Sequence, residues 1–71
     1  MELEKHLREL KSELTNREEQ KEQAYKNLLE LKGKPEYNIA FGKYDALCSI
    51  CEDLKVDIFL TEKLIIEDEN K

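Results

Sequence analysis

Apolar residues recur along the first half of the chain in alternating steps of three and four. The recurring positions are Leu3, Leu7, Leu10, Leu14, Arg17, Lys21, Ala24, Leu28 and Leu31. Seven of these nine residues are apolar, and their spacing puts them on one side of an α-helix, as in the heptad repeat of a coiled coil. The pattern predicts a helix over residues 2–32.

The second half of the chain repeats this spacing. Its recurring positions are Tyr37, Ala40, Tyr44, Leu47, Cys51, Leu54, Ile58, Thr61 and Ile65. They predict a second helix over residues 36–67 and an acidic tail over 68–71. The β-branched stretch 56–66 could also suit a strand, but no Gly or Pro interrupts it and a lone strand would have no sheet to join. We therefore expect helix there.

The two patterns are separated by a turn at residues 33–35. Gly33 suits the position just after a helix, and Pro35 suits the first turn of the next one. If the chain reverses there, residue i meets about residue 68 − i, and every recurring position finds a recurring position on the other arm. We call these 18 positions the seam. The sequence predicts an all-α fold, with residues 1–71 forming a single antiparallel helical hairpin.

Composition agrees with long helices and sets limits on function. Charged residues make up 41% of the chain, with two Gly and one Pro. At 71 residues the chain is too short for a large core, and its net charge of −5 argues against broad binding to a phosphate backbone. No apolar run approaches the roughly 20 residues that span a bilayer, and the N-terminus lacks the apolar core of a signal peptide. We expect a cytoplasmic protein without membrane contact.

The two cysteines form a C-x-x-C motif, Cys48 and Cys51. Structural zinc sites use four ligands, and the one histidine, His6, belongs near the opposite end of the hairpin. Redox pairs of this spacing sit at a helix N-terminus, whereas these cysteines fall in mid-helix. We therefore expect both side chains to pack as small apolar groups. Metal binding, redox chemistry and an intersubunit disulfide stay as alternatives.

Arg17 and Lys21 are the two charged residues in the first half of the seam. In one interpretation, their stems cover apolar surface while their charges reach water. In the other, they fix the register of the helices or face an acidic partner. We favour the first interpretation. We expect His6 to be solvated. The sequence contains no phosphate-binding loop or nucleophile motif, and a hairpin has no water-excluding cleft. We expect no enzyme activity, no cofactor and no bound metal.

The second helix carries apolar residues beside the seam as well as in it. The predicted interface residues are Phe41, Cys48, Ile50, Phe59, Leu60, Leu64 and Ile66. A helix that is apolar on several sides is normally buried on several sides, so two hairpins packed through their second helices would form a homodimeric four-helix bundle. This arrangement resembles the Rop family of dimeric hairpins, which bind RNA loops and regulate plasmid copy number. The resemblance is one of architecture and carries over no functional residue.

These features predict a small, acidic, non-enzymatic interaction or regulatory protein, of the kind found among bacterial and phage accessory proteins. It would self-associate and bind or inhibit an unidentified protein through the apolar surface of its second helix. The alternative is a Rop-like RNA-binding regulator. Its phosphate contacts would come from the basic residues of the first helix, Lys5, Arg8, Lys11, Arg17, Lys21 and Lys26. These do not share one face and alternate with glutamates, so nucleic-acid binding ranks second.

Overall fold

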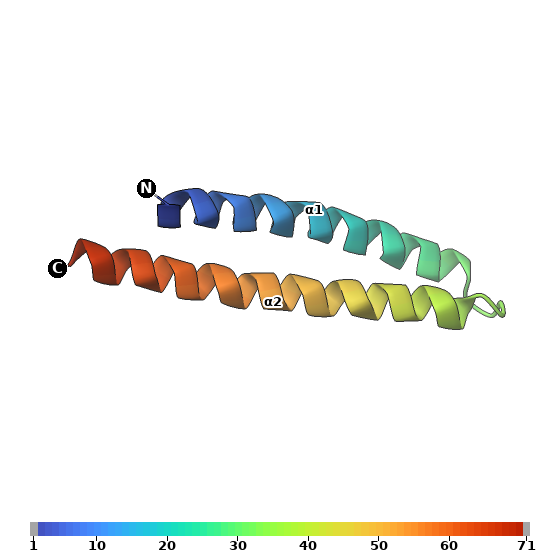
Figure 1. Ribbon diagram of the computed structural model, residues 1–71. Helices are drawn as coiled ribbons and strands as arrows, with labels where there is room; N and C mark the ends of the chain where they lie inside the picture. Colours follow the sequence, from blue (N-terminus) through green and yellow to red (C-terminus); the bar gives the residue numbers. More distant parts are fainter. Residues whose placement is uncertain (1, 71) are drawn as a thin grey trace.

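The computed structural model describes residues 2–70 as two antiparallel helices. Helix α1 spans Glu2–Glu30 and helix α2 spans Tyr37–Glu69, and they lie side by side along their length (Figure 1). The Cα atoms fill a rod 57 Å long and 14 by 12 Å across. The predicted all-helical hairpin is confirmed. Residues 1 and 71, the two ends of the predicted domain, lie outside the described residues.

The turn is longer than the three residues expected, because α1 ends at Glu30 rather than at residue 32. Beyond Glu30 the backbone tightens: the Lys34 N–H donates to the Leu31 carbonyl at 2.8 Å, and the Tyr37 N–H to the Lys34 carbonyl at 3.1 Å. These bonds span three residues instead of four. Gly33 has a φ of 84°, in the left-handed region that an absent Cβ makes accessible. Pro35 lies in the turn, before α2 begins.

Helix α2 is continuous, so the β-branched stretch 56–66 is helical throughout. Within residues 2–70 there is no strand for such a segment to join. The helix also runs past residue 67: Asp68 and Glu69 belong to it, and the Asn70 N–H donates to the Ile66 carbonyl at 3.2 Å. The described part of the expected acidic tail is therefore mostly helix.

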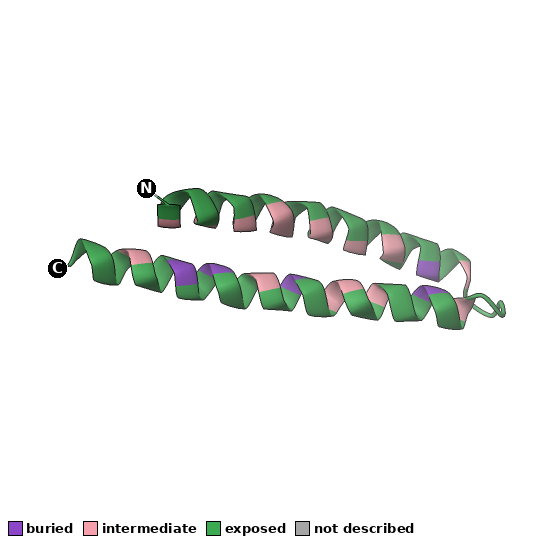
Figure 2. Ribbon diagram, viewed as in Figure 1, coloured by how far each residue is buried: buried purple, intermediate pink, exposed green. Residues whose placement is uncertain are grey.

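The core is a single line: the buried and half-buried positions follow the sides of the two helices that face each other (Figure 2). Leu28, Ala40, Cys51, Ile58 and Thr61 are buried, and all other seam residues are half-buried. The Thr61 hydroxyl, the one polar group buried in this line, donates to the Asp57 carbonyl at 2.7 Å. Each seam residue is shielded by the opposite helix on one side only, which is why most of them stay partly accessible.

Contacts between the arms show the register. The Tyr25 and Tyr44 rings lie 5.7 Å apart between centroids, and Leu3 and Ile65 line the same cleft at the open end. Both pairs follow the rule that residue i meets about residue 68 − i. Lys11 Nζ approaches Glu62 Oε2 at 4.0 Å across the side of the hairpin. The helices are therefore aligned with seam facing seam.

This register predicts a crosslink between positions 10 and 58. Cysteines introduced as Leu10→Cys and Ile58→Cys, in a chain that also carries Cys48→Ala and Cys51→Ala, should form an intramolecular disulfide on mild oxidation. The measurement is mass spectrometry of the oxidised monomer at high dilution. Position 10 paired with a cysteine at position 47 is the control, because 11 residues shift the partner by about 16 Å along α2. Equal crosslinking of positions 47 and 58 would contradict the register.

Candidate interaction surface

Helix α2 exposes large apolar side chains outside the seam. Their exposed fractions are 70% for Ile39, 65% for Phe59 and 58% for Ile66. Of the predicted interface residues, all are exposed except Cys48, which is half-buried. On α1 the large apolar residues that are exposed are Tyr25 and Leu29. The surplus apolar surface therefore belongs mainly to α2.

This surface divides into two stripes, one on each side of the seam. The first, which we call the Phe41 side, contains Phe41, Cys48, Phe59 and Ile66. The second, the Ile50 side, contains Ile39, Ala46, Ile50, Leu60 and Leu64. The spacing within each stripe keeps its members on one side of a helix with 3.6 residues per turn. Val56, which is 55% exposed, lies on the back of α2 and was not predicted.

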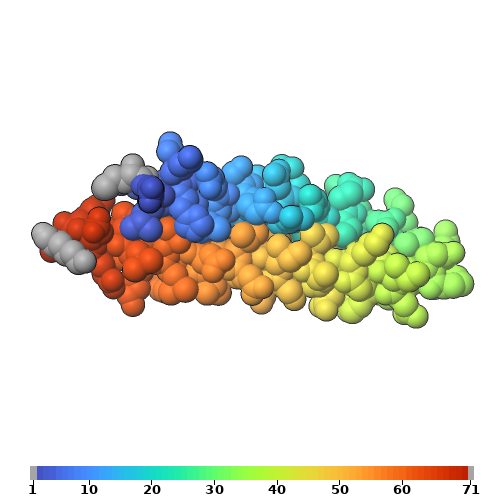
Figure 3. All heavy atoms as spheres, in the orientation of Figure 1, coloured from blue at the N-terminus to red at the C-terminus, as the bar shows by residue number. Residues whose placement is uncertain are grey.

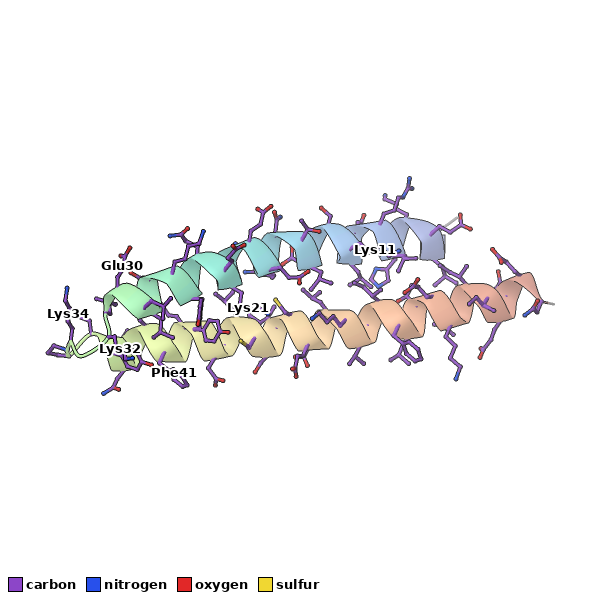
Figure 4. All side chains as sticks on the ribbon, turned by 180° about the vertical axis from the view of Figure 1, so that it is seen from behind. Lys11, Lys21, Glu30, Lys32, Lys34 and Phe41 are labelled. Atoms are coloured by element: carbon purple, nitrogen blue, oxygen red, sulfur yellow. The ribbon has the colours of Figure 1, made fainter. Side chains whose placement is uncertain are left out.

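Neighbouring contacts show which side of the hairpin the Phe41 side occupies. The Phe41 ring stacks on Tyr37 at 6.3 Å, and Phe41 projects from α2 away from α1 (Figure 4). A hydrogen bond with the Cys48 side chain raises the pKa of Tyr44 above its ordinary value of 10.0. Tyr44 in turn contacts Tyr25 of α1. The exposed Tyr25 therefore continues the Phe41 side onto α1 near the turn.

The cysteines occupy different environments. Cys51 is the most buried residue described, with 1% of its surface exposed, and Cys48 is half-buried; both are free thiols. Among residues 2–70, no three His, Cys, Asp or Glu side chains gather so that they could hold a metal ion. This placement supports apolar packing for Cys51 and puts Cys48 at the edge of the exposed stripe.

Arg17 and Lys21 are both half-buried in the seam. Arg17 turns back along its own helix, with Nε 2.8 Å from Glu13 Oε1 and Nη1 3.2 Å from Gln20 Oε1. Lys21 projects from the side of α1 that faces α2 (Figure 4). The Arg17 geometry supports the interpretation in which the stem covers the seam while the charge is satisfied locally. His6 is exposed.

Elsewhere among residues 2–70, the two helices leave a cleft at one end of the rod. Side chains fill the space between the helices over most of its length (Figure 3). The cleft at the open end is lined by Glu2, Leu3, Glu4, Ile65, Asp68 and Glu69. Neither described helix contains an apolar stretch long enough to cross a membrane. The extended apolar sides of α2 are the candidate functional site.

No protein-family model matches this chain, and neither a curated protein nor a solved structure matches it. The surface of the hairpin itself therefore indicates the function, through its two apolar stripes, the charged residues beside them and the contacts that position them.

Lys21 allows a direct test of how the seam is stabilised. Lys21→Leu should raise the free energy of unfolding by about 1 kcal/mol, because an apolar side chain in this half-buried position adds buried apolar area. Lys26→Leu is the matched control, because the Lys26 side chain is 63% exposed and faces solvent. Chemical denaturation followed by circular dichroism measures both. Equal effects of the two substitutions would contradict the seam position of Lys21.

Proposed function

We propose that this protein is a small non-enzymatic interaction or regulatory module that self-associates through α2 and binds another protein through the same helix. The observation that carries the proposal is the apolar surface on both sides of the α2 seam. Its free cysteines suit a reducing compartment, and the cytoplasm is the setting we propose.

The energetic argument starts from the thin core. Among residues 2–70, only Leu28, Ala40, Cys51 and Ile58 are buried apolar residues, whereas α2 leaves several larger side chains in water. Burying one such side chain fully contributes roughly 1.5–3 kcal/mol. A two-helix chain of this size is marginal by itself. Association through α2 would stabilise the hairpin and cover its apolar surface in one step.

The titratable groups support a binding role rather than catalysis. No carboxylate, amine or imidazole among residues 2–70 is buried, and the apolar stripes lie on the outside of a narrow rod. Acid–base catalysis depends on groups held in a site that excludes water. A long apolar surface suits contact with another helix instead.

Charge supports a protein partner over RNA. Two of the basic residues of α1 are paired with glutamates of the same helix, Arg17 with Glu13 at 2.8 Å and Lys26 with Glu22 at 3.8 Å. These pairs reduce the positive charge that phosphate groups would meet. On α2, Asp53 lies in the Ile50 side, so a partner segment that combines apolar with basic side chains would complement it.

Self-association is tested by sedimentation equilibrium at tens of micromolar. The wild type should be a dimer, and the double variant Ile50→Asp, Phe59→Asp, which places a carboxylate on each apolar side of α2, should be a monomer of much lower stability, because a carboxylate in the contact would have to be buried. Glu9→Lys, an exposed position of α1, is the control and should stay dimeric. A stable, monomeric wild type would contradict self-association.

A further inference from the structure

The Phe41 side has the same pattern in both chain directions. Seven residues separate Phe41 from Cys48, and seven separate Phe59 from Ile66. Between these two pairs lie Glu52, four residues after Cys48, and Lys55, four residues before Phe59. The pattern is symmetric about a point between Asp53 and Leu54. For these six residues, reversal of the chain exchanges apolar with apolar positions and exchanges Glu52 with Lys55, whereas at the edges of the face it exchanges two acids, Asp45 and Glu62.

We propose that the Phe41 side is the homodimer interface and that a second copy of the chain packs there antiparallel, with a twofold axis passing between Asp53 and Leu54. Phe41 then opposes the partner's Ile66, and Cys48 opposes the partner's Phe59. At the centre, Glu52 opposes the partner's Lys55, and the symmetry makes each of these pairs occur twice. This inference rests on the proposed self-association and names the face and register that it uses.

The geometry of α2 permits this contact. At about 100° per residue, the four apolar members lie within about 20° of one line along the helix, and Glu52 and Lys55 flank that line by about 30° on either side. Phe41, Phe59 and Ile66 are each about half exposed or more, and Phe59 and Ile66 line one shallow depression. Charged stems beside an apolar line are the usual arrangement at helix–helix contacts.

One pair of charges on α1 follows the same axis. In the hairpin register, the twofold axis passes α1 near residues 14 and 15. There Lys11 would oppose the partner's Glu18. The Lys11–Glu62 contact places Lys11 on the Phe41 side of the hairpin. Two hairpins joined this way put α1 beside the partner's α1 and α2 beside the partner's α2, which is a four-helix bundle.

Other arrangements of two copies bring like charges together. A parallel pairing of the Phe41 side would oppose Lys55 to the partner's Lys55, and Glu52 to the partner's Glu52. An antiparallel pairing of the Ile50 side that matches Ile50 with the partner's Leu60 would oppose Asp53 to the partner's Asp57. Like charges in direct opposition oppose association. The antiparallel Phe41 pairing avoids both conflicts and leaves the Ile50 side open for an unlike partner.

The remaining charges on this face lie at its two edges. Asp45 lies at the outer edge, where its counterpart in this register is the partner's Glu62, and the residue next to that counterpart is Lys63. Glu62 lies at the inner edge, where it already contacts Lys11 of its own chain. Each of these two acids therefore has a basic neighbour as well as the opposed acid.

A disulfide tests the register directly. In a chain carrying Cys51→Ala and Phe59→Cys, native Cys48 should form two symmetric interchain disulfides with position 59 of the second copy. Within one chain these positions are about 16 Å apart along α2, beyond the roughly 7 Å Cα separation that a disulfide can bridge. Leu60→Cys in the same background is the control, because position 60 lies on the Ile50 side. Non-reducing electrophoresis at low protein concentration should show a covalent dimer for position 59 only.

A charge exchange tests the pairing itself. Glu52→Lys and Lys55→Glu should each weaken homodimerisation about tenfold or more, because each variant opposes like charges twice. A mixture of the two variants should form a heterodimer of wild-type affinity, because every central pair is again opposite in sign. Asp53→Lys makes the same charge change as Glu52→Lys on the other side of α2 and should leave the dimer unchanged. Sedimentation equilibrium at low salt measures all four samples.

The outcomes separate this inference from the proposed function. Selective crosslinking at position 59 together with rescue in the mixture supports the Phe41 interface. The wild type could instead be a dimer in which position 59 does not crosslink selectively and in which Glu52→Lys and Lys55→Glu dimerise as well as Asp53→Lys. That result would contradict the Phe41 interface but not self-association. A monomeric wild type overturns self-association, and the interface with it.

Discussion

The structure depends on the packing of one helix seam against the other. Two helices share a single line of contact, so each seam residue is covered from one direction only. Cys51 lies in the middle of that line and is the most buried residue described, whereas Leu3 and Ile65 border an open cleft at its end. No second layer supports this line among residues 2–70. The proposed association would therefore stabilise the hairpin by covering further apolar surface from outside.

Exposed apolar residues on α2 provide this surface. In α1 the positions outside the seam are mostly charged, and Lys26 pairs there with Glu22 of the same helix. In α2 the corresponding positions hold Phe59, Leu64 and Ile66, which are all more than half exposed. This asymmetry distinguishes a mostly charged helix from a helix with exposed apolar sides. It is the reason why α2 contains the candidate site.

The periodicity of the sequence predicted the fold because helix packing and residue spacing follow from the same 3.6-residue turn. The end of α1 was less predictable. Gly33 marks the turn, but the last residue of the helix depends on backbone hydrogen bonds such as the one from the Lys34 N–H to the Leu31 carbonyl. The direction of the Arg17 side chain depends on its rotamer, which spacing does not determine. The exposed Val56 was missed because its neighbours Lys55 and Asp57 made that part of α2 resemble a solvated face.

The central claim is that the hairpin gains its stability from association through α2. Its most direct test is the midpoint of thermal unfolding, measured by circular dichroism over about a hundredfold range of protein concentration. A dimer that unfolds to separate chains should melt several degrees higher at the top of this range, by mass action. A midpoint that is high and independent of concentration would show that the single hairpin is stable alone, and would contradict the account.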